Sequence, residues 1–195
     1  MRAHPPRLAA SLSPASRPLA TARASDLDTR WRTALECGDG AAGAHVIHEL
    51  WMRGEFAARI EATLAELWKR AAPTIPEWLP MRYVDWLPLA YEVALRFRAA
   101  ARGRYNVYLV LLDYEERTRG PYGVYVGMTH YAPAQRFDQH KAGIHAAGSV
   151  LKRGLELLTG PTLHLQRLAR AEALRIEAGL AEALRDAGLL VEGGH

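Results

Sequence analysis

The feature that most constrains the fold is a β-branched and apolar run of strand length near the middle of the chain, Tyr105–Leu112 (YNVYLVLL). Its length and its β-branched and aromatic residues predict a strand. A charged loop follows, and Tyr122–Val126 predicts a second strand that ends at Gly127. Two strands joined by so short a connection pair most readily as antiparallel neighbours. We therefore expect a β-hairpin here.

The rest of the second half alternates helical and strand patterns. Helical spacing predicts helices at residues 133–141, 149–158 and 168–187, with Gly143 and Gly188 as stops, and Thr162–Gln166 predicts a short third strand. The expected order is strand, strand, helix, helix, strand, helix. For residues 103–195 we therefore predict an α+β domain with a small three-stranded antiparallel sheet flanked by helices.

Residues 26–102 have helical spacing and no strand pattern. Ser25 and Asp28 predict a capping box at the first helix, and the glycine-rich segment 38–43 predicts a loop. Base-stacking platforms and a buried core both suit the tryptophans of this segment, and at helical spacing the core is favoured. All five tryptophans of the chain lie here: Trp31, Trp51, Trp68, Trp78 and Trp86. We predict an all-α module whose role the sequence does not assign.

The basic charge is concentrated at the N-terminus. The formal net charge is +4, and residues 1–25 contain four arginines and no acid. This segment lacks large apolar residues, so we expect a disordered basic tail. Its composition is similar to that of an organellar transit peptide, but Pro5-Pro6 and Ser13-Pro14 argue against the amphipathic helix of such a peptide. Any nucleic-acid site must therefore depend on local residues, and not on bulk charge.

Two absences narrow the class of protein. No apolar stretch approaches the roughly 18 residues that span a bilayer, so we expect no membrane partner. The single cysteine, Cys37, cannot form an intramolecular disulfide and suits a reducing compartment. The sequence therefore favours a cytoplasmic protein.

Glu177 occupies an unusual position on the last predicted helix. At about 100° per residue it falls within the apolar half of that helix, whose stripe comprises Ala173, Ile176, Leu180, Leu184 and Ala187. A carboxylate placed there loses hydration, which is unfavourable unless a cation, a donor or a metal replaces the water. A glutamate at the edge of the stripe that reaches solvent is the alternative.

Arg136 and His140 are four residues apart, so on a helix both project from one face. A guanidinium beside an imidazole suits a phosphate, although such a pair is also common on solvated helix surfaces. Tyr108 and Tyr125 lie within the two strands of the hairpin, where packing alone could account for either. The pattern becomes specific when these four residues and Glu177 are taken together.

Taken in order, these elements resemble the GIY-YIG nuclease family. Asn106-Val107-Tyr108 corresponds to the first motif of the family, and Tyr125-Val126-Gly127 to the second. Arg136 and His140 correspond to its R-x-x-x-H helix, and Glu177 to its metal-binding glutamate. The resemblance covers roughly residues 105–194. Asn106 stands where the motif has glycine, and two valines replace isoleucines, which preserves strand packing.

The resemblance implies a metal-dependent endonuclease that hydrolyses DNA phosphodiester bonds in duplex or branched DNA. Glu177 would hold one divalent ion, Mg²⁺ or Mn²⁺, and Arg136 would offset charge on the phosphate. Tyr108 would take a proton from the attacking water and pass it to His140 or to solvent, and Tyr125 would orient the water or the phosphate. His130, just after the second motif, is an extra donor or a solvated loop residue.

Two other classes of function remain open. A fold of this kind that has lost activity would serve as a nucleic-acid-binding or protein-interaction module. A nucleophilic tyrosine would instead form a covalent DNA adduct, which leaves Glu177 with no metal to bind. The helical module leaves open a homodimer or a protein partner. The enzyme hypothesis requires that the two phenols, the guanidinium and the distant acid converge in space.

Overall fold

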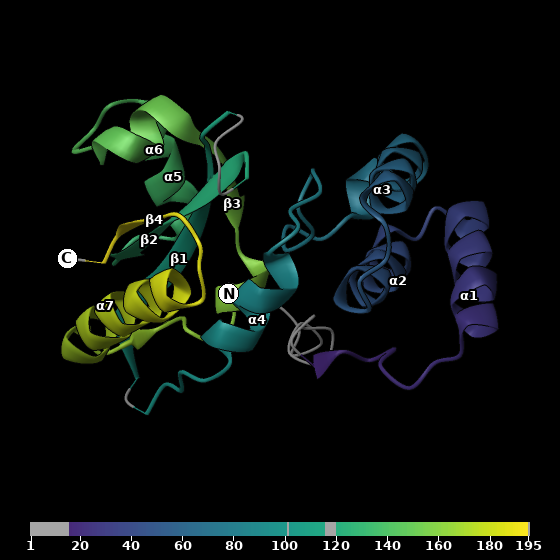
Figure 1. Ribbon diagram of the computed structural model, residues 1–195, viewed down its shortest axis with the longest axis horizontal. Coiled ribbons are helices and arrows are strands. Elements are labelled where there is room, and N and C mark those ends of the chain that lie inside the picture. The colour runs from purple at the N-terminus through teal and green to yellow at the C-terminus, as the bar shows by residue number, and fades with distance from the viewer. Residues whose placement is uncertain (1–15, 101, 116–119, 195) are drawn as a thin grey trace, which may run out of the picture. The chain divides into compact units, whose positions relative to one another are not determined.

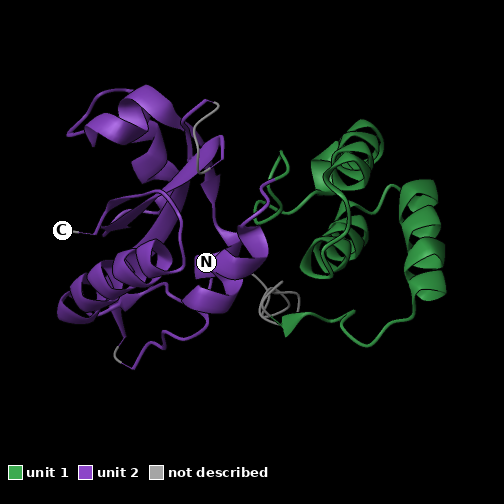
Figure 2. Cartoon of the chain, in the orientation of Figure 1, with its two compact units in different colours: residues 1–83 green, residues 84–195 purple. Residues whose placement is uncertain are grey.

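The computed structural model describes residues 16–100, 102–115 and 120–194, and the chain divides into two compact units, residues 1–83 and 84–195 (Figure 2). The division lies before the predicted boundary at residues 102–103. The difference is helix α4 (Leu87–Ala94), which packs against helix α7 (Arg170–Asp186) and the short helix η4 (Gly160–Thr162) of the second unit. Helical spacing predicted that α4 forms but not which partner buries it.

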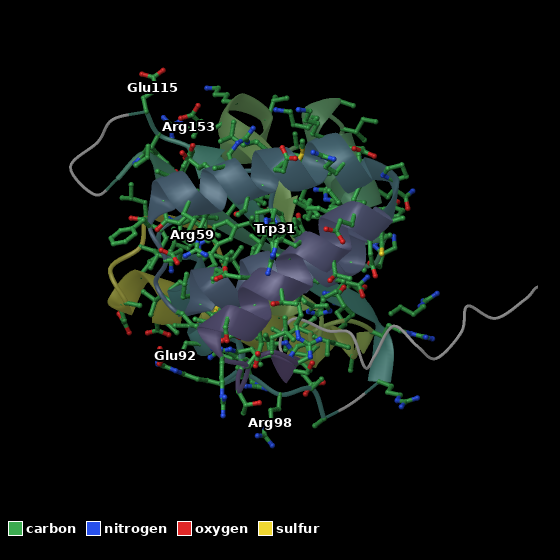
Figure 3. The ribbon with its side chains drawn as sticks, turned by 90° about the vertical axis from the view of Figure 1, so that its right-hand side faces the viewer. Trp31, Arg59, Glu92, Arg98, Glu115 and Arg153 are labelled. Atoms are coloured by element: carbon green, nitrogen blue, oxygen red, sulfur yellow. The ribbon has the colours of Figure 1, made fainter. Side chains whose placement is uncertain are left out.

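Unit 1 consists of helices α1 (Ala24–Cys37), α2 (Gly40–Met52) and α3 (Ala57–Ala71), followed by the short helix η3 (Ala72–Thr74) (Figure 1). Its core includes the buried side chains of Leu27, Ile60 and Leu67. Trp51 is buried and stacks on Tyr83, with ring centroids 5.3 Å apart. The other tryptophans, Trp31 of Figure 3 among them, are only half-buried, so the expected tryptophan core is confined to Trp51.

The start of α2 differs from the predicted loop at residues 38–43. Gly38 ends α1 with a φ of 64°, and Asp39 then caps α2 by accepting the Ala42 N–H at 2.9 Å. A Cβ at Gly40 would lie 2.6 Å from the backbone nitrogen of Ile75, so this glycine allows close packing inside a helix. The cap of α1 is also shifted, because Asp26 accepts the Arg23 N–H in place of the expected pair Ser25 and Asp28.

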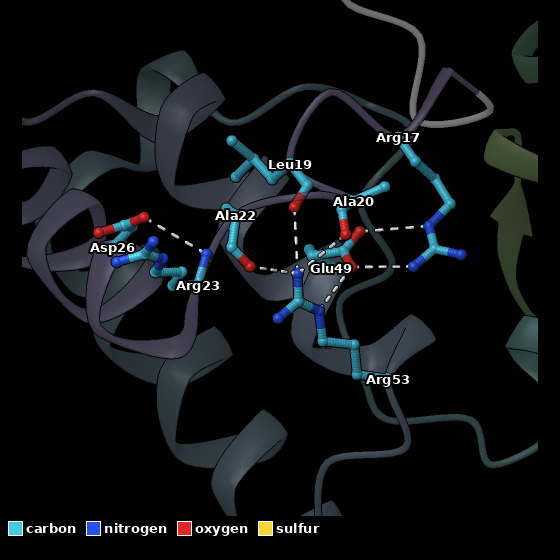
Figure 4. Close-up of polar contacts among 8 residues, drawn as sticks. All are labelled: Arg17, Leu19, Ala20, Ala22, Arg23, Asp26, Glu49 and Arg53. Atoms are coloured by element: carbon cyan, nitrogen blue, oxygen red, sulfur yellow. Dashed lines mark hydrogen bonds and ion pairs between the residues drawn. The ribbon is translucent and has the colours of Figure 1, made fainter.

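The predicted disordered tail, residues 1–25, lies partly outside the described residues. From Arg17 onward the chain is fastened to α2 (Figure 4). Arg17 donates to the buried Glu49 at 2.8 Å, and Arg53 donates to Glu49 at 2.7 Å and to the carbonyls of residues 19, 20 and 22. Burial raises the pKa of Glu49, but the two arginines outweigh it and lower that pKa below its usual value. Such contacts do not fit a disordered segment.

Unit 2 is α+β, as predicted, but its sheet is mixed and has four strands. Strands β1 (Arg102–Asp113), β2 (Tyr122–Thr129), β3 (Gly154–Leu158) and β4 (Val191–Gly193) lie in the order β3-β1-β2-β4. The pairs of β1 with β2 and with β3 are antiparallel, which confirms the hairpin. Strand β4 pairs with β2 in parallel. The prediction of a three-stranded, fully antiparallel sheet is therefore wrong.

The third strand lies at residues 154–158, inside the segment predicted as helix 149–158. Helix α6 (Gly148–Arg153) ends there because the chain turns extended at Gly154, where a Cβ would lie 2.5 Å from the Val150 carbonyl oxygen. The predicted strand Thr162–Gln166 forms part of η4 and a turn. It still lies beside β1, since Leu165 accepts the Val107 N–H, but it forms no ladder.

Helices cover both faces of the sheet (Figure 1). Helices α5 (Pro133–Lys141) and α6 lie on one face, and α4 and α7 lie on the other. On the α5 face Tyr108 and Val110 pack with Val150, whereas Val107 and Leu109 point the opposite way by alternation. All of these side chains are buried, which explains why the stretch Val107–Leu112 of β1 carries no charged residue.

Several charged side chains on unit 2 point into solvent. Those of Glu92, Arg98 and Glu115 extend away from the ribbon in Figure 3 and are exposed. Within the described part of the chain, no helix has the length and apolar character needed to cross a bilayer.

Candidate active site

The hairpin register places the two motif tyrosines side by side on the α5 face. Tyr108 of β1 lies opposite Gly127 of β2, and Tyr125 lies opposite Val110. The centroids of the two phenol rings are 6.1 Å apart. A Cβ at Gly127 would lie 2.6 Å from the ring of Tyr125 and 2.8 Å from the hydroxyl of Tyr108. The glycine of the second motif therefore leaves the space that both rings occupy.

We expect Gly127→Ala to destabilise the protein by about 2 kcal/mol, because the added methyl group overpacks a buried cluster. The matched control is Gly148→Ala, since a Cβ at Gly148 meets nothing within 4 Å. Thermal unfolding of the two variants measures the difference. Equal unfolding midpoints for both variants would mean that the tyrosine rings do not depend on Gly127.

His140 completes a buried aromatic cluster with the two tyrosines. Its ring centroid is 6.3 Å from that of Tyr108 and 5.8 Å from that of Tyr125. The Tyr108 hydroxyl lies 2.8 Å from Nε2 of His140, and the Ala147 N–H donates to Nδ1 at 2.9 Å. An Nδ1 that accepts carries no proton, so in the neutral ring Nε2 carries it and donates to Tyr108.

This tautomer corrects the expected direction of proton transfer. His140 donates to Tyr108 and cannot accept a proton from it through Nε2. Burial, with a contribution from the charge of Arg136, lowers the pKa of His140 to about 4, so the ring is neutral at pH 7. The Tyr108 oxygen accepts this bond, which leaves the hydroxyl hydrogen of Tyr108 to donate elsewhere. The sequence offered no signal for this arrangement, because the deciding group is a backbone N–H.

Burial also raises the pKa values of the two phenols. It raises the pKa of Tyr108 well above the usual range, the charge of Tyr125 adds to this, and only Arg136 opposes it. Burial raises the pKa of Tyr125 as well, and the charge of Glu177 adds to that effect. Tyr108 is 1% exposed. Both groups are therefore neutral hydrogen-bonding groups at pH 7, and Tyr108 does not have the pKa that a general base needs.

Arg136 supplies the positive charge beside this cluster. It is placed on α5 one turn before His140, and its charge lowers the pKa of Tyr108, Tyr125 and His140. The guanidinium is held by the loop after α5, donating to the carbonyls of Ile144 at 3.3 Å and His145 at 2.8 Å. In the R-x-x-x-H pair, His140 is thus a buried member of the aromatic cluster and Arg136 is the cation beside it. The two residues do not form a solvated pair on the helix surface.

Glu177 reaches the same region from a different element. Helix α7 packs on the face opposite α5, but Oε1 of Glu177 accepts the Met128 N–H at 3.1 Å, beyond the end of β4. The side chain is 8% exposed. Burial raises its pKa to about 7, and the Met128 bond only partly offsets this. The expected position within the apolar half of the helix is confirmed.

The acid therefore lies at the free edge of β2, one residue past Gly127. Its charge acts on Tyr125, which links it to the aromatic cluster. The structure thus brings together Tyr108, Tyr125, Arg136 and His140, and it adds Glu177 at the margin of this group. The exposed His130 instead contacts Tyr131, with ring centroids 4.0 Å apart, and does not join the cluster.

Glu177 is the one candidate metal ligand of this set. Among the described residues no group of three or more histidine, cysteine, aspartate or glutamate side chains could hold an ion. A buried carboxylate with one hydrogen bond, and with no ion pair in the described part of the chain, fits a hard cation that keeps most of its water ligands. Mg²⁺ and Mn²⁺ are such cations.

The chain matches no protein-family model, no curated protein and no solved structure. The resemblance to the GIY-YIG family thus rests on the sequence motifs alone.

Proposed function

We propose that unit 2 is a metal-dependent endonuclease of the GIY-YIG class that hydrolyses DNA phosphodiester bonds. The observation that carries this proposal is the convergence of an arginine, a histidine and two tyrosines from β1, β2 and α5, with an acid from α7 at their margin. A cation beside neutral hydroxyl donors is a combination that stabilises a phosphate as it gains charge.

Each side chain then has a role that follows from its surroundings. Arg136 offsets negative charge on the scissile phosphate, and the hydroxyls of Tyr108 and Tyr125 donate to phosphate oxygens or position the attacking water. His140 holds Tyr108 in place, because its Nε2–H donates to the phenol oxygen. This assignment replaces the expected role of Tyr108 as a base, which its raised pKa opposes.

Glu177 would hold the divalent ion through the carboxylate oxygen that Met128 does not use. The ion, when bound, supplies positive charge to the scissile phosphate and its leaving oxygen. Glu177, which acts on the nearby Tyr125, can hold the ion only when its carboxylate is ionised. Ionisation requires a pH near or above the Glu177 pKa of about 7.

An inactive module that binds nucleic acid or protein is the second candidate function, and one observation favours it. Tyr108 and His140 are 1% and 0% exposed, so the substrate reaches Tyr108 only if the cover of the cluster opens. An inactive module that binds nucleic acid predicts that DNA binds and is never cut.

Plasmid nicking distinguishes the two functions. Supercoiled plasmid is incubated with the full chain and Mg²⁺ or Mn²⁺, with a chelator in a parallel sample. The nuclease produces nicked circles before linear DNA, because one active site cuts one strand, and the chelator stops it. Binding of the plasmid without nicking under every metal condition would overturn the proposal and support the inactive module.

A further inference from the structure

At the open end of the hairpin, three aromatic rings lie next to one another in a surface that the proposed active site does not use. Tyr105 of β1 and His130, just after β2, have ring centroids 6.2 Å apart, and Tyr131 follows at 4.0 Å from His130. Tyr131 is 37% exposed, and His130 is exposed as well. We name these three residues the aromatic end of the hairpin.

Asn106 connects this aromatic end to a second loop. Its side-chain amide donates to the Tyr131 carbonyl at 2.7 Å, and its side-chain oxygen accepts the Arg167 N–H at 2.9 Å. Arg167 has a φ of 61°, a conformation that non-glycine residues adopt rarely and that this bond helps to hold. Asn106 therefore holds the backbones of Tyr131 and Arg167, two residues with exposed side chains, near each other.

The three segments around the aromatic end are rich in arginine. Residues 102–106, 129–132 and 165–171 contribute Arg102, Arg104, Arg167 and Arg170 and neither aspartate nor glutamate. All four arginines are exposed, and none forms an ion pair within the described part of the chain. Hydrogen bonds join the segments, since Gly103 N–H donates to the Arg167 carbonyl at 2.7 Å. The nearby Glu172 accepts the Ala100 N–H.

We infer that the aromatic end of the hairpin and its arginines bind single-stranded DNA. Exposed rings can stack on bases only where the bases are unstacked from a partner strand, and arginines neutralise the phosphates between them. Duplex DNA offers the phosphates without the base faces. The inference deepens the proposed function and rests on it: the DNA that reaches the site would carry a single-stranded segment, as branched, gapped or frayed DNA does.

The test measures binding in the absence of cleavage. A labelled single strand about 16 nucleotides long and its duplex are titrated with the full chain in chelator, using fluorescence anisotropy. We expect the single strand to bind more tightly than the duplex. Tyr131→Ala should weaken single-strand binding about tenfold, whereas Tyr131→Phe, which keeps the ring, should stay within about twofold. Duplex binding should change little in either variant.

Salt dependence tests the arginines separately. Arg167→Gln should reduce the slope of log affinity against log salt by about 0.7, the value for one phosphate contact on a single strand. Arg30→Gln, an exposed arginine of α1, should leave the slope unchanged. Equal binding by Tyr131→Ala and Tyr131→Phe, equal affinity for single strand and duplex, or no oligonucleotide binding would each overturn the inference.

The outcomes separate this inference from the proposed function. If DNA binding depends on Tyr131 but the chain never nicks DNA, the single-strand surface is supported and the nuclease is rejected. If the chain nicks DNA but its binding does not depend on Tyr131, the nuclease is supported and the single-strand surface is rejected. The variants lie outside the aromatic cluster of Tyr108, Tyr125 and His140, so they leave the proposed catalytic groups intact.

Discussion

Glu177→Gln should abolish plasmid nicking and at the same time make the protein more stable at pH 8. The pKa of Glu177 is about 7 in the fold and 4.5 in its ordinary state, so the folded chain holds the proton more tightly. Ionisation therefore opposes folding: the cost is absent below pH 4.5, grows as the pH rises and is complete above pH 7. The difference corresponds to about 3 kcal/mol. Glutamine keeps the shape and the acceptor for Met128 without the charge.

Denaturant unfolding at pH 4.5 and pH 8, together with nicking assays, measures both effects. Wild type and Glu177→Gln should be equally stable at pH 4.5 and diverge by pH 8. Glu182→Gln is the matched control, since Glu182 is exposed on the same helix. It should change neither stability nor nicking. Unchanged nicking by Glu177→Gln with metal present would remove the proposed hydrolytic site. If Glu177→Gln is only as stable as the wild type at pH 8, or less stable, then the ionised Glu177 is not a buried, uncompensated charge.

A divalent ion is expected to affect both the stability and the nicking activity that depend on Glu177. In the proposed function the ion would bind the Glu177 carboxylate, so Mg²⁺ should raise the unfolding midpoint of the wild type at pH 8 and leave Glu177→Gln unaffected. Nicking should increase from pH 6 to pH 8, as Glu177 ionises, while His140 stays neutral over that range. A stability that depends on Mg²⁺ equally in both proteins would place the ion elsewhere.

The sequence predicted the elements of unit 2 that have a strong local pattern. Strand β1 was evident because its central residues Val107–Leu112 are covered on both faces of the sheet and form a continuous hydrophobic run. The helix with Arg136 and His140 was evident from Pro133 and the helical spacing. Strand β4 was missed because Val191–Gly193 is only three residues long and has no strand pattern of its own. It forms where α7 returns the chain to the free edge of β2, which is a tertiary effect.

The residues of the candidate site could be selected from the sequence, but their hydrogen bonds and protonation could not. Order and spacing indicated Tyr108, Arg136 and Glu177, and the structure brings the first two into one cluster and the third to its margin. The sequence could not predict which ring nitrogen of His140 carries the proton, because the backbone N–H of Ala147 decides it. The sequence also could not predict which residues bury Tyr108, since Val150 and Phe137, which pack over it, come from other elements.

Tyr108→Phe should reduce nicking by about a hundredfold or more, because in the proposed function the Tyr108 hydroxyl donates to the phosphate or positions the attacking water. The change also leaves the buried Nε2–H of His140 without its acceptor, which costs about 1–3 kcal/mol of stability. Unfolding midpoints must therefore accompany the rates. Tyr122→Phe, on β2 of the same sheet, is the control and should keep the wild-type rate.

NMR of the ring nitrogens of His140 gives a readout that a loss of stability cannot imitate. In the wild type Nε2 should be protonated and Nδ1 bare from pH 8 down to near pH 4, where the ring gains its second proton. Tyr108→Phe should keep this tautomer, because Ala147 sets it and the phenol does not. A proton on Nδ1, or a ring that titrates near pH 6.5, would show that His140 can accept from Tyr108 and would restore the phenol as a candidate base.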